Sequence, residues 1–214
     1  MRKEDRYPIV CLVIYIIVFL IGAIKPWYFL NWVLESSLPL IFVFLLIKTY
    51  KRFRFSNLSY TCMLLFLILH TIGAHYTYSL VPLTKDALYF LGLSRNFYDW
   101  IVHFLFGLLM YFPAKEFLNK NYKSFSKKYP YLGTVFFLIA AGILFEIIEW
   151  GVYLFVGDEK LTTAFIAAQG ETFYLLMDSF VDLALNLLGS LLAAAIFFAS
   201  PKKKNQFPAF HLTS

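Results

Sequence analysis

The chain has 214 residues, of which 60% are hydrophobic, 21% aromatic and only 15% charged. Its mean hydropathy of +0.68 excludes an ordinary soluble domain and predicts an integral membrane protein. The formal net charge of +6 does not indicate a nucleic-acid partner, because the basic residues lie between apolar segments rather than along one face.

Six apolar segments follow one another along the chain, with connections too short to fold separately. The first contains no charge and is longer than the apolar core of a signal peptide, usually about 7 to 15 residues, so we expect an uncleaved span. Each segment can cross a hydrocarbon core of about 30 Å at about 1.5 Å per residue. The expected spans are 8–24, 27–47, 58–82, 97–114, 131–156 and 173–200. They predict an all-α bundle of six transmembrane helices that forms a single membrane domain over residues 1–214.

The basic residues predict how these spans are oriented. Of the 19 Lys and Arg, 15 lie in the two tails and in the second and fourth connections, all on one side of a six-span bundle. The positive-inside rule therefore predicts that both termini are cytoplasmic. On the opposite side, the mildly apolar segment 162–168 is either a re-entrant piece or a plain surface loop.

Eight ionisable side chains lie inside the last four spans, in pairs. Partners three or four residues apart share a helix face, whereas a spacing of five separates the two histidines of the third span by roughly 140°. Counted from the predicted outer helix ends at about 1.5 Å per residue, six groups lie about 8 to 15 Å deep, His70 about 18 Å and Asp99 about 3 Å. The pairs are His70 and His75, Asp99 and His103, Glu146 and Glu149, and Asp178 and Asp182.

Charged side chains within a bilayer are expected to face one another. Each costs about 2.5 to 3.5 kcal/mol at a helix centre on the insertion scale, and clustered carboxylates cannot all stay ionised without positive charge nearby. Helix bundles hold metal ions with His and carboxylate pairs of this spacing. We therefore predict a divalent metal ion, zinc, iron or manganese; a proton or cation pathway and a purely structural polar network remain alternatives. The predicted ligands are His75, His103, Glu146, Glu149, Asp178 and Asp182.

Other polar residues are expected around these ligands. Arg95, at the outer rim, would steer an anionic substrate. Glu35 in the second span is expected to be a packing or rim residue, with a contribution to the site as the alternative. Hydrogen-bonding support is expected from His70, Tyr76, Tyr78, Asn96, Asp99 and Asn186.

Several short motifs stand between residues 58 and 200: HTIGAHYTY at 70–78, Val81-Pro82, RNFYD at 95–99 with His103, EIIEW at 146–150, QGE at 169–171, and Asp178 with Asn186. Together they resemble the YjdF-like family of small bacterial inner-membrane proteins. The resemblance implies a six-span bundle in the bacterial cytoplasmic membrane and assigns no reaction. Two positions depart from the family pattern: Glu171 replaces the usual Asp, and Trp100 replaces a basic residue.

The site chemistry favours a metal-dependent membrane hydrolase that acts on a lipid or lipid-linked substrate. Glu146 or Asp182, left out of the coordination shell, would be the general base. Proton or divalent-cation transport by the same carboxylates is the alternative, but the inner halves of spans three to six are almost wholly apolar and no inverted repeat is evident. A scaffold with a structural metal is a third possibility.

Overall fold

The computed structural model describes residues 5–82, 97–156 and 171–199, and within these ranges it is entirely helical, as predicted. Five helices are long and apolar enough to cross a membrane, and α1 is a shorter apolar helix of 17 residues. Arg95, Asn96 and the segment 162–168 lie outside the described residues. The helices are α1 (Arg6–Gly22), α2 (Phe29–Thr49), α3 (Asn57–His75), α5 (Tyr98–Asn121), α6 (Lys123–Lys128), α7 (Leu132–Val156) and α9 (Glu171–Ala199).

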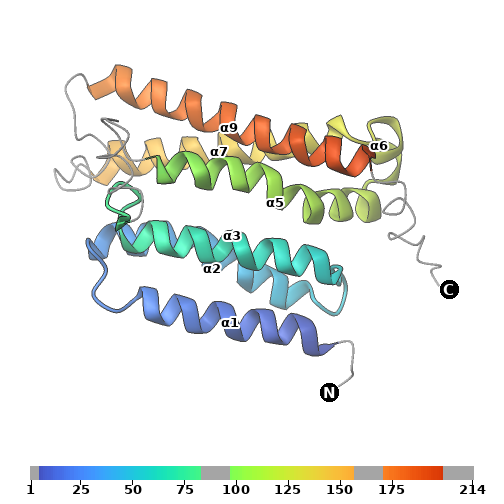
Figure 1. Ribbon diagram of the computed structural model, residues 1–214, viewed down its shortest axis with the longest axis horizontal. Helices are drawn as coiled ribbons and strands as arrows, with labels where there is room; N and C mark the ends of the chain where they lie inside the picture. The colour runs from blue at the N-terminus through green and yellow to red at the C-terminus, as the bar shows by residue number, and fades with distance from the viewer. Residues whose placement is uncertain (1–4, 83–96, 157–170, 200–214) are drawn as a thin grey trace.

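The six long helices run side by side and alternate in direction (Figure 1). Helix α5 has the central position and packs on α3, α7 and α9, while α1 and α2 pack on α3. The start of α1 and the end of α9 lie at the same end of the bundle, and α5 and α9 both begin at the opposite end (Figure 1).

Large apolar side chains cover the outward faces of the helices. Leu20, Phe44, Leu144 and Phe198 are each about 60% exposed. Exposing such a surface to water is unfavourable. Exposing it to the hydrocarbon of a bilayer is not, because lipid tails are also apolar. This surface is that of a protein embedded in a bilayer.

The tightest helix contact joins α5 and α9. A Cβ atom at Gly107 would collide with the carbonyl oxygen of Asn186, and one at Gly189 would collide with that of Phe104. Small residues at a crossing let two backbones approach closely, which is a common way for membrane helices to associate. Asn186 is fully buried there and donates to the carbonyl oxygen of Leu138 in α7 at 3.3 Å.

The end of α3 corrects the predicted third span. The helix ends at His75 rather than at Pro82, because Thr77 and Tyr78 adopt positive φ angles of 52° and 54° that reverse the chain. The backbone N–H of Tyr78 donates to the carbonyl oxygen of Gly73 at 2.7 Å, and only a glycine at position 73 leaves room for the Tyr78 ring. His75 is therefore the last residue of the helix, and its depth in the bilayer stays a prediction.

Candidate metal site

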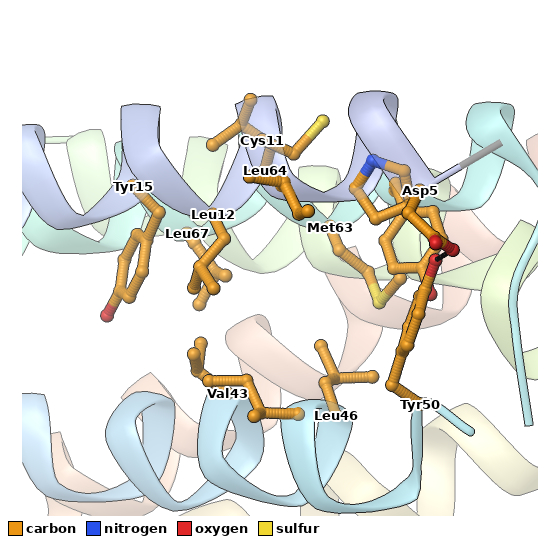
Figure 2. A pocket seen from close by; sticks show the side chains of 14 residues that line it. Asp5, Cys11, Leu12, Tyr15, Val43, Leu46, Tyr50, Met63, Leu64 and Leu67 are labelled. Carbon is orange, nitrogen blue, oxygen red and sulfur yellow. Dashed lines mark hydrogen bonds between the residues drawn. The ribbon is translucent and has the colours of Figure 1, made fainter. Parts of the chain in front are cut away.

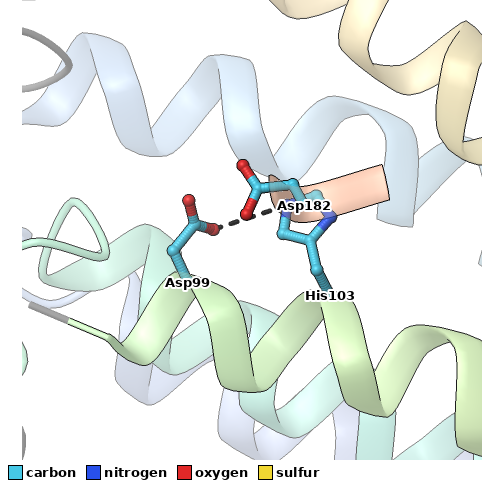
Figure 3. Close-up of side chains that lie close together, drawn as sticks. All are labelled: Asp99, His103 and Asp182. Carbon is cyan, nitrogen blue, oxygen red and sulfur yellow. Dashed lines mark ion pairs between the residues drawn. The ribbon is translucent and has the colours of Figure 1, made fainter. Parts of the chain in front are cut away.

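The first two turns of α5 place Asp99 and His103 on one face, as their spacing predicts. The Nε2 atom of His103 lies 3.5 Å from Oδ1 of Asp99. Asp182 of α9 faces this pair (Figure 3). One ligand atom from each of the three residues lies within 4.8 Å of the other two. We call Asp99, His103 and Asp182 the triad.

The triad could hold a divalent metal ion. Zinc binds nitrogen and oxygen ligands at about 2.0 to 2.2 Å, so two ligand atoms on opposite sides of an ion are at most about 4.4 Å apart. The triad atoms lie within 4.8 Å of one another, so they would have to draw slightly together around an ion. One imidazole and two carboxylates form a donor set that suits zinc, iron or manganese.

Helix α7 adds Glu146 and Glu149 beside the triad, and α9 adds Asp178. Glu146 and Asp178 lie close enough to interact electrostatically with His103, and Glu149 interacts in the same way with Asp99 and Asp182. Glu146 is buried, and its Oε1 atom accepts no hydrogen bond from the residues that the structure describes. A buried acceptor oxygen without a donor is costly, so a cation or a proton beside it would lower the free energy of the fold.

Helices α2 and α3 extend the group of charges through His70, which is buried. Its Nε2 atom lies 3.0 Å from the carbonyl oxygen of Glu35 and 3.9 Å from the Glu35 carboxylate. Since a carbonyl oxygen only accepts, Nε2 carries the proton; in the neutral ring Nδ1 then accepts from the Tyr78 hydroxyl, 2.6 Å away. The turn that ends α3 thus holds Tyr78 against His70.

These residues form one electrostatic network, which we call the polar cluster. Glu35 interacts with Asp99, and His70 with His103. Within the described part of the chain the cluster has six carboxylates and two imidazoles, so negative charge is in excess where water is scarce. Bound cations or protons must offset that excess. The members are Glu35, His70, Asp99, His103, Glu146, Glu149, Asp178 and Asp182.

Not every residue expected at the site lies in the polar cluster. The Nδ1 atom of His75 lies 2.8 Å from the carbonyl oxygen of Gly22 in α1, and its ring contacts that of Tyr76. Asn186 lies one turn along α9 from Asp182 and contacts α7 instead. The metal-ligand role of His75 and the supporting roles of Tyr76 and Asn186 stay predictions.

Two further residues of this region have clear positions. Glu35, expected as a packing or rim residue with a contribution to the site as the alternative, is buried beside His70. Tyr78, expected to give hydrogen-bonding support, is the hydroxyl partner of that histidine. A glutamate inside an otherwise apolar span was the available signal for Glu35. No sequence pattern indicates the turn that positions Tyr78.

Known proteins agree with the membrane architecture. Residues 7–203 match the family described as "Predicted membrane protein (DUF2238)". The chain is 32% identical over 170 residues to "Inner membrane protein YjdF" of Escherichia coli (strain K12), covering 79% of this chain and 78% of that protein. No solved structure matches. The expected resemblance to YjdF-like proteins is therefore confirmed, and the chain belongs to the DUF2238 family of membrane proteins.

Proposed function

We propose that this protein is a divalent-metal-dependent membrane hydrolase whose metal ion is held by the triad, Asp99, His103 and Asp182. The observation that supports it best is the convergence of one imidazole nitrogen and two carboxylate oxygens from α5 and α9 within 4.8 Å. Asp99, expected only as support, becomes a ligand in this proposal, whereas His103 and Asp182 keep the role predicted for them.

The excess of carboxylates supports a metal ion rather than a neutral polar network. Glu146, Glu149 and Asp178 surround the triad and interact electrostatically with its members. A structural network would need donors for these oxygens, yet Oε1 of Glu146 has none among the described residues. A divalent ion offsets two of the negative charges, and the nearby carboxylates orient its ligands.

Glu146 is the proposed general base. A divalent ion bound by the triad would lower the pKa of a bound water molecule and polarise a phosphoryl or acyl oxygen. Glu146, which interacts electrostatically with His103, would accept the proton of that water through its unpaired oxygen. Glu149 and Asp178 would hold the metal-bound groups in position.

The substrate class follows from the location of the triad. Asp99 is in the first turn of α5, so the site lies near one end of the bundle, at the depth of lipid headgroups and ester linkages. The bilayer itself would present a lipid or lipid-linked ester there. Arg95, four positions before Asp99, is proposed to attract the anionic part of such a substrate.

Transport of protons or cations is the weaker proposal. A transport path needs polar groups through the other half of the bundle. There, Cys62, Tyr111, Val135, Leu138 and Phe197 form a buried, mostly apolar core. A polar site with an apolar core beyond it is better suited to an enzyme than to a transporter.

Metal analysis of the detergent-purified protein tests the proposal. We expect about one zinc, iron or manganese ion per chain in the wild type and a loss of at least tenfold in His103→Ala. His75→Ala is the matched control and should retain the metal, because His75 lies against Gly22. Glu146→Gln should also retain the metal but abolish hydrolysis in a screen of phospholipid and lipid-linked phosphate esters. Equal metal content in wild type and His103→Ala would refute the site.

We further propose a six-span topology in the bacterial inner membrane, with both termini cytoplasmic. The distribution of Lys and Arg, the shared end of α1 and α9 and the YjdF relative support it. In a variant without its own cysteines, Lys25→Cys should react with an impermeant maleimide in intact cells, whereas Lys51→Cys should be protected. The reverse pattern would invert the topology.

A further inference from the structure

A second candidate binding site lies among the first three helices, α1, α2 and α3. A cavity of about 320 Å³ separates α1 from α2, with α3 behind it (Figure 2). Most of its lining is aliphatic, and no member of the polar cluster lines it. We call this cavity the α1/α2 groove; its walls include Leu12, Tyr15, Val43, Leu46, Met63 and Leu67.

One end of the groove is polar and basic. The Tyr50 hydroxyl donates to Oδ1 of Asp5 at 2.7 Å, which links the start of α1 to the end of α2 (Figure 2). Three exposed basic side chains adjoin these two residues in the sequence: Arg6, Lys51 and Arg52. This end carries a net positive charge at the expected level of lipid headgroups.

We propose that the α1/α2 groove binds one acyl chain of an anionic phospholipid, whose headgroup lies beside Arg6 and Lys51. Water is a poor occupant because the apolar walls offer few hydrogen-bonding partners. Another helix, about 10 Å wide with its side chains, is too wide for a cavity of this volume. A single hydrocarbon chain fits both the volume and the chemistry of the walls.

The charge at the polar end selects the headgroup. Basic residues at the membrane surface attract anionic lipids, and basic pockets between transmembrane helices bind their headgroups. The Tyr50 hydroxyl is bonded to Asp5. The exposed basic neighbours of these two residues, Arg6 and Lys51, are therefore the side chains that would contact a phosphodiester. A zwitterionic lipid would enter the same groove with less affinity.

Native mass spectrometry of the full chain tests this site with phosphatidylglycerol and phosphatidylcholine added in equal amounts. We expect one phosphatidylglycerol molecule to survive activation that removes the other lipids. Val43→Trp, which fills the groove, should reduce the retained fraction at least fivefold. Leu45→Trp is the matched control, because Leu45 is on the same helix but exposed on its outer face, and it should retain the lipid as the wild type does.

A second variant keeps the packing intact. Arg6→Gln combined with Lys51→Gln should bring the retention of phosphatidylglycerol down to that of phosphatidylcholine. Retention in Val43→Trp equal to that in Leu45→Trp would overturn the groove as the site. An unchanged preference for phosphatidylglycerol in the double variant would overturn the assignment of the headgroup. Because neither variant touches the triad, metal content should be unaffected in both.

Discussion

The two ends of the α5–α9 pair differ in what meets between the helices. Toward the end where α5 begins, Asp99 and His103 face Asp182 of α9, and the groups are charged or ionisable. Beyond Asn186 the contact consists of Gly107, Gly189 and small or apolar residues. Changes in salt or pH alter the repulsion between charged groups, but they do not alter the steric contact between closely packed atoms. The close-packed end therefore fixes the distance at which the charged groups meet at the other end.

The largest effect is expected from disturbing the close-packed end. In Gly189→Ala, the added Cβ collides with the carbonyl oxygen of Phe104, and overpacking of this kind costs about 1 to 3 kcal/mol of unfolding free energy. Because the helices must move apart, the variant should also lose metal. Thermal unfolding in detergent and metal analysis measure the two effects.

Gly151→Ala is the matched control for that prediction. Among the described residues, no atom outside the adjoining backbone of α7 lies within 4 Å of a Cβ at Gly151, so this variant should be as stable as the wild type or slightly more stable. A similar loss of stability in both variants would mean that helix flexibility, rather than the α5–α9 contact, explains the result.

Removal of metal tests the charged end. A ligand present at 100 times its dissociation constant stabilises a folded protein by about 2.7 kcal/mol, so a chelator should lower the unfolding temperature of the wild type. Asp182→Asn, which removes one ligand charge, should not respond. Glu116→Gln replaces a carboxylate that bonds to Ser56 and Ser59 away from the cluster, and it should respond as the wild type does. A response in Asp182→Asn would contradict the triad.

The two ends of α3 differ in how well the sequence predicts them. Its start is marked by a polar connection and by Ser56, whose hydroxyl accepts from the Ser59 N–H. Its end has no such mark, because residues 76–82 are uncharged and the turn depends on positive φ angles at Thr77 and Tyr78, which these residue types rarely adopt. That turn carries Tyr78 back to His70, which lies in the polar cluster, whereas His75 lies against Gly22.

The site was predictable to the extent that it is local to one helix. Asp99 and His103 share a face because they are four residues apart, and the structure confirms this. Which face of α2 meets α3 depends on packing between helices, so sequence spacing did not place Glu35 beside His70. The glycine contact was equally hidden, since a glycine at a crossing looks in the sequence like any other helix glycine, such as Gly151.

A smaller effect is expected from Tyr78→Phe, which removes the hydroxyl bonded to His70. The bond is 2.6 Å long and partly buried, and the loss of such a bond typically costs about 0.5 to 1.5 kcal/mol. Tyr7→Phe is the control, because its bond to Thr61 is exposed and should contribute less. Chemical unfolding of both variants in the same detergent gives the comparison, and equal losses would contradict a special role for the Tyr78 turn.

The smallest effect is expected from Ser190→Ala at the close-packed end. The Ser190 hydroxyl donates to the carbonyl oxygen of Asn186 on its own helix at 2.8 Å, and this bond links no second helix. Hydrogen bonds between membrane helices average only about 0.6 kcal/mol, so a bond within one helix should contribute about 0.5 kcal/mol or less. The unfolding free energy should therefore fall less than in Tyr78→Phe. If Ser190→Ala is the more damaging of the two, the Ser190 hydroxyl contributes more to the close-packed end than a bond within α9 explains, and glycine packing is not the main interaction there.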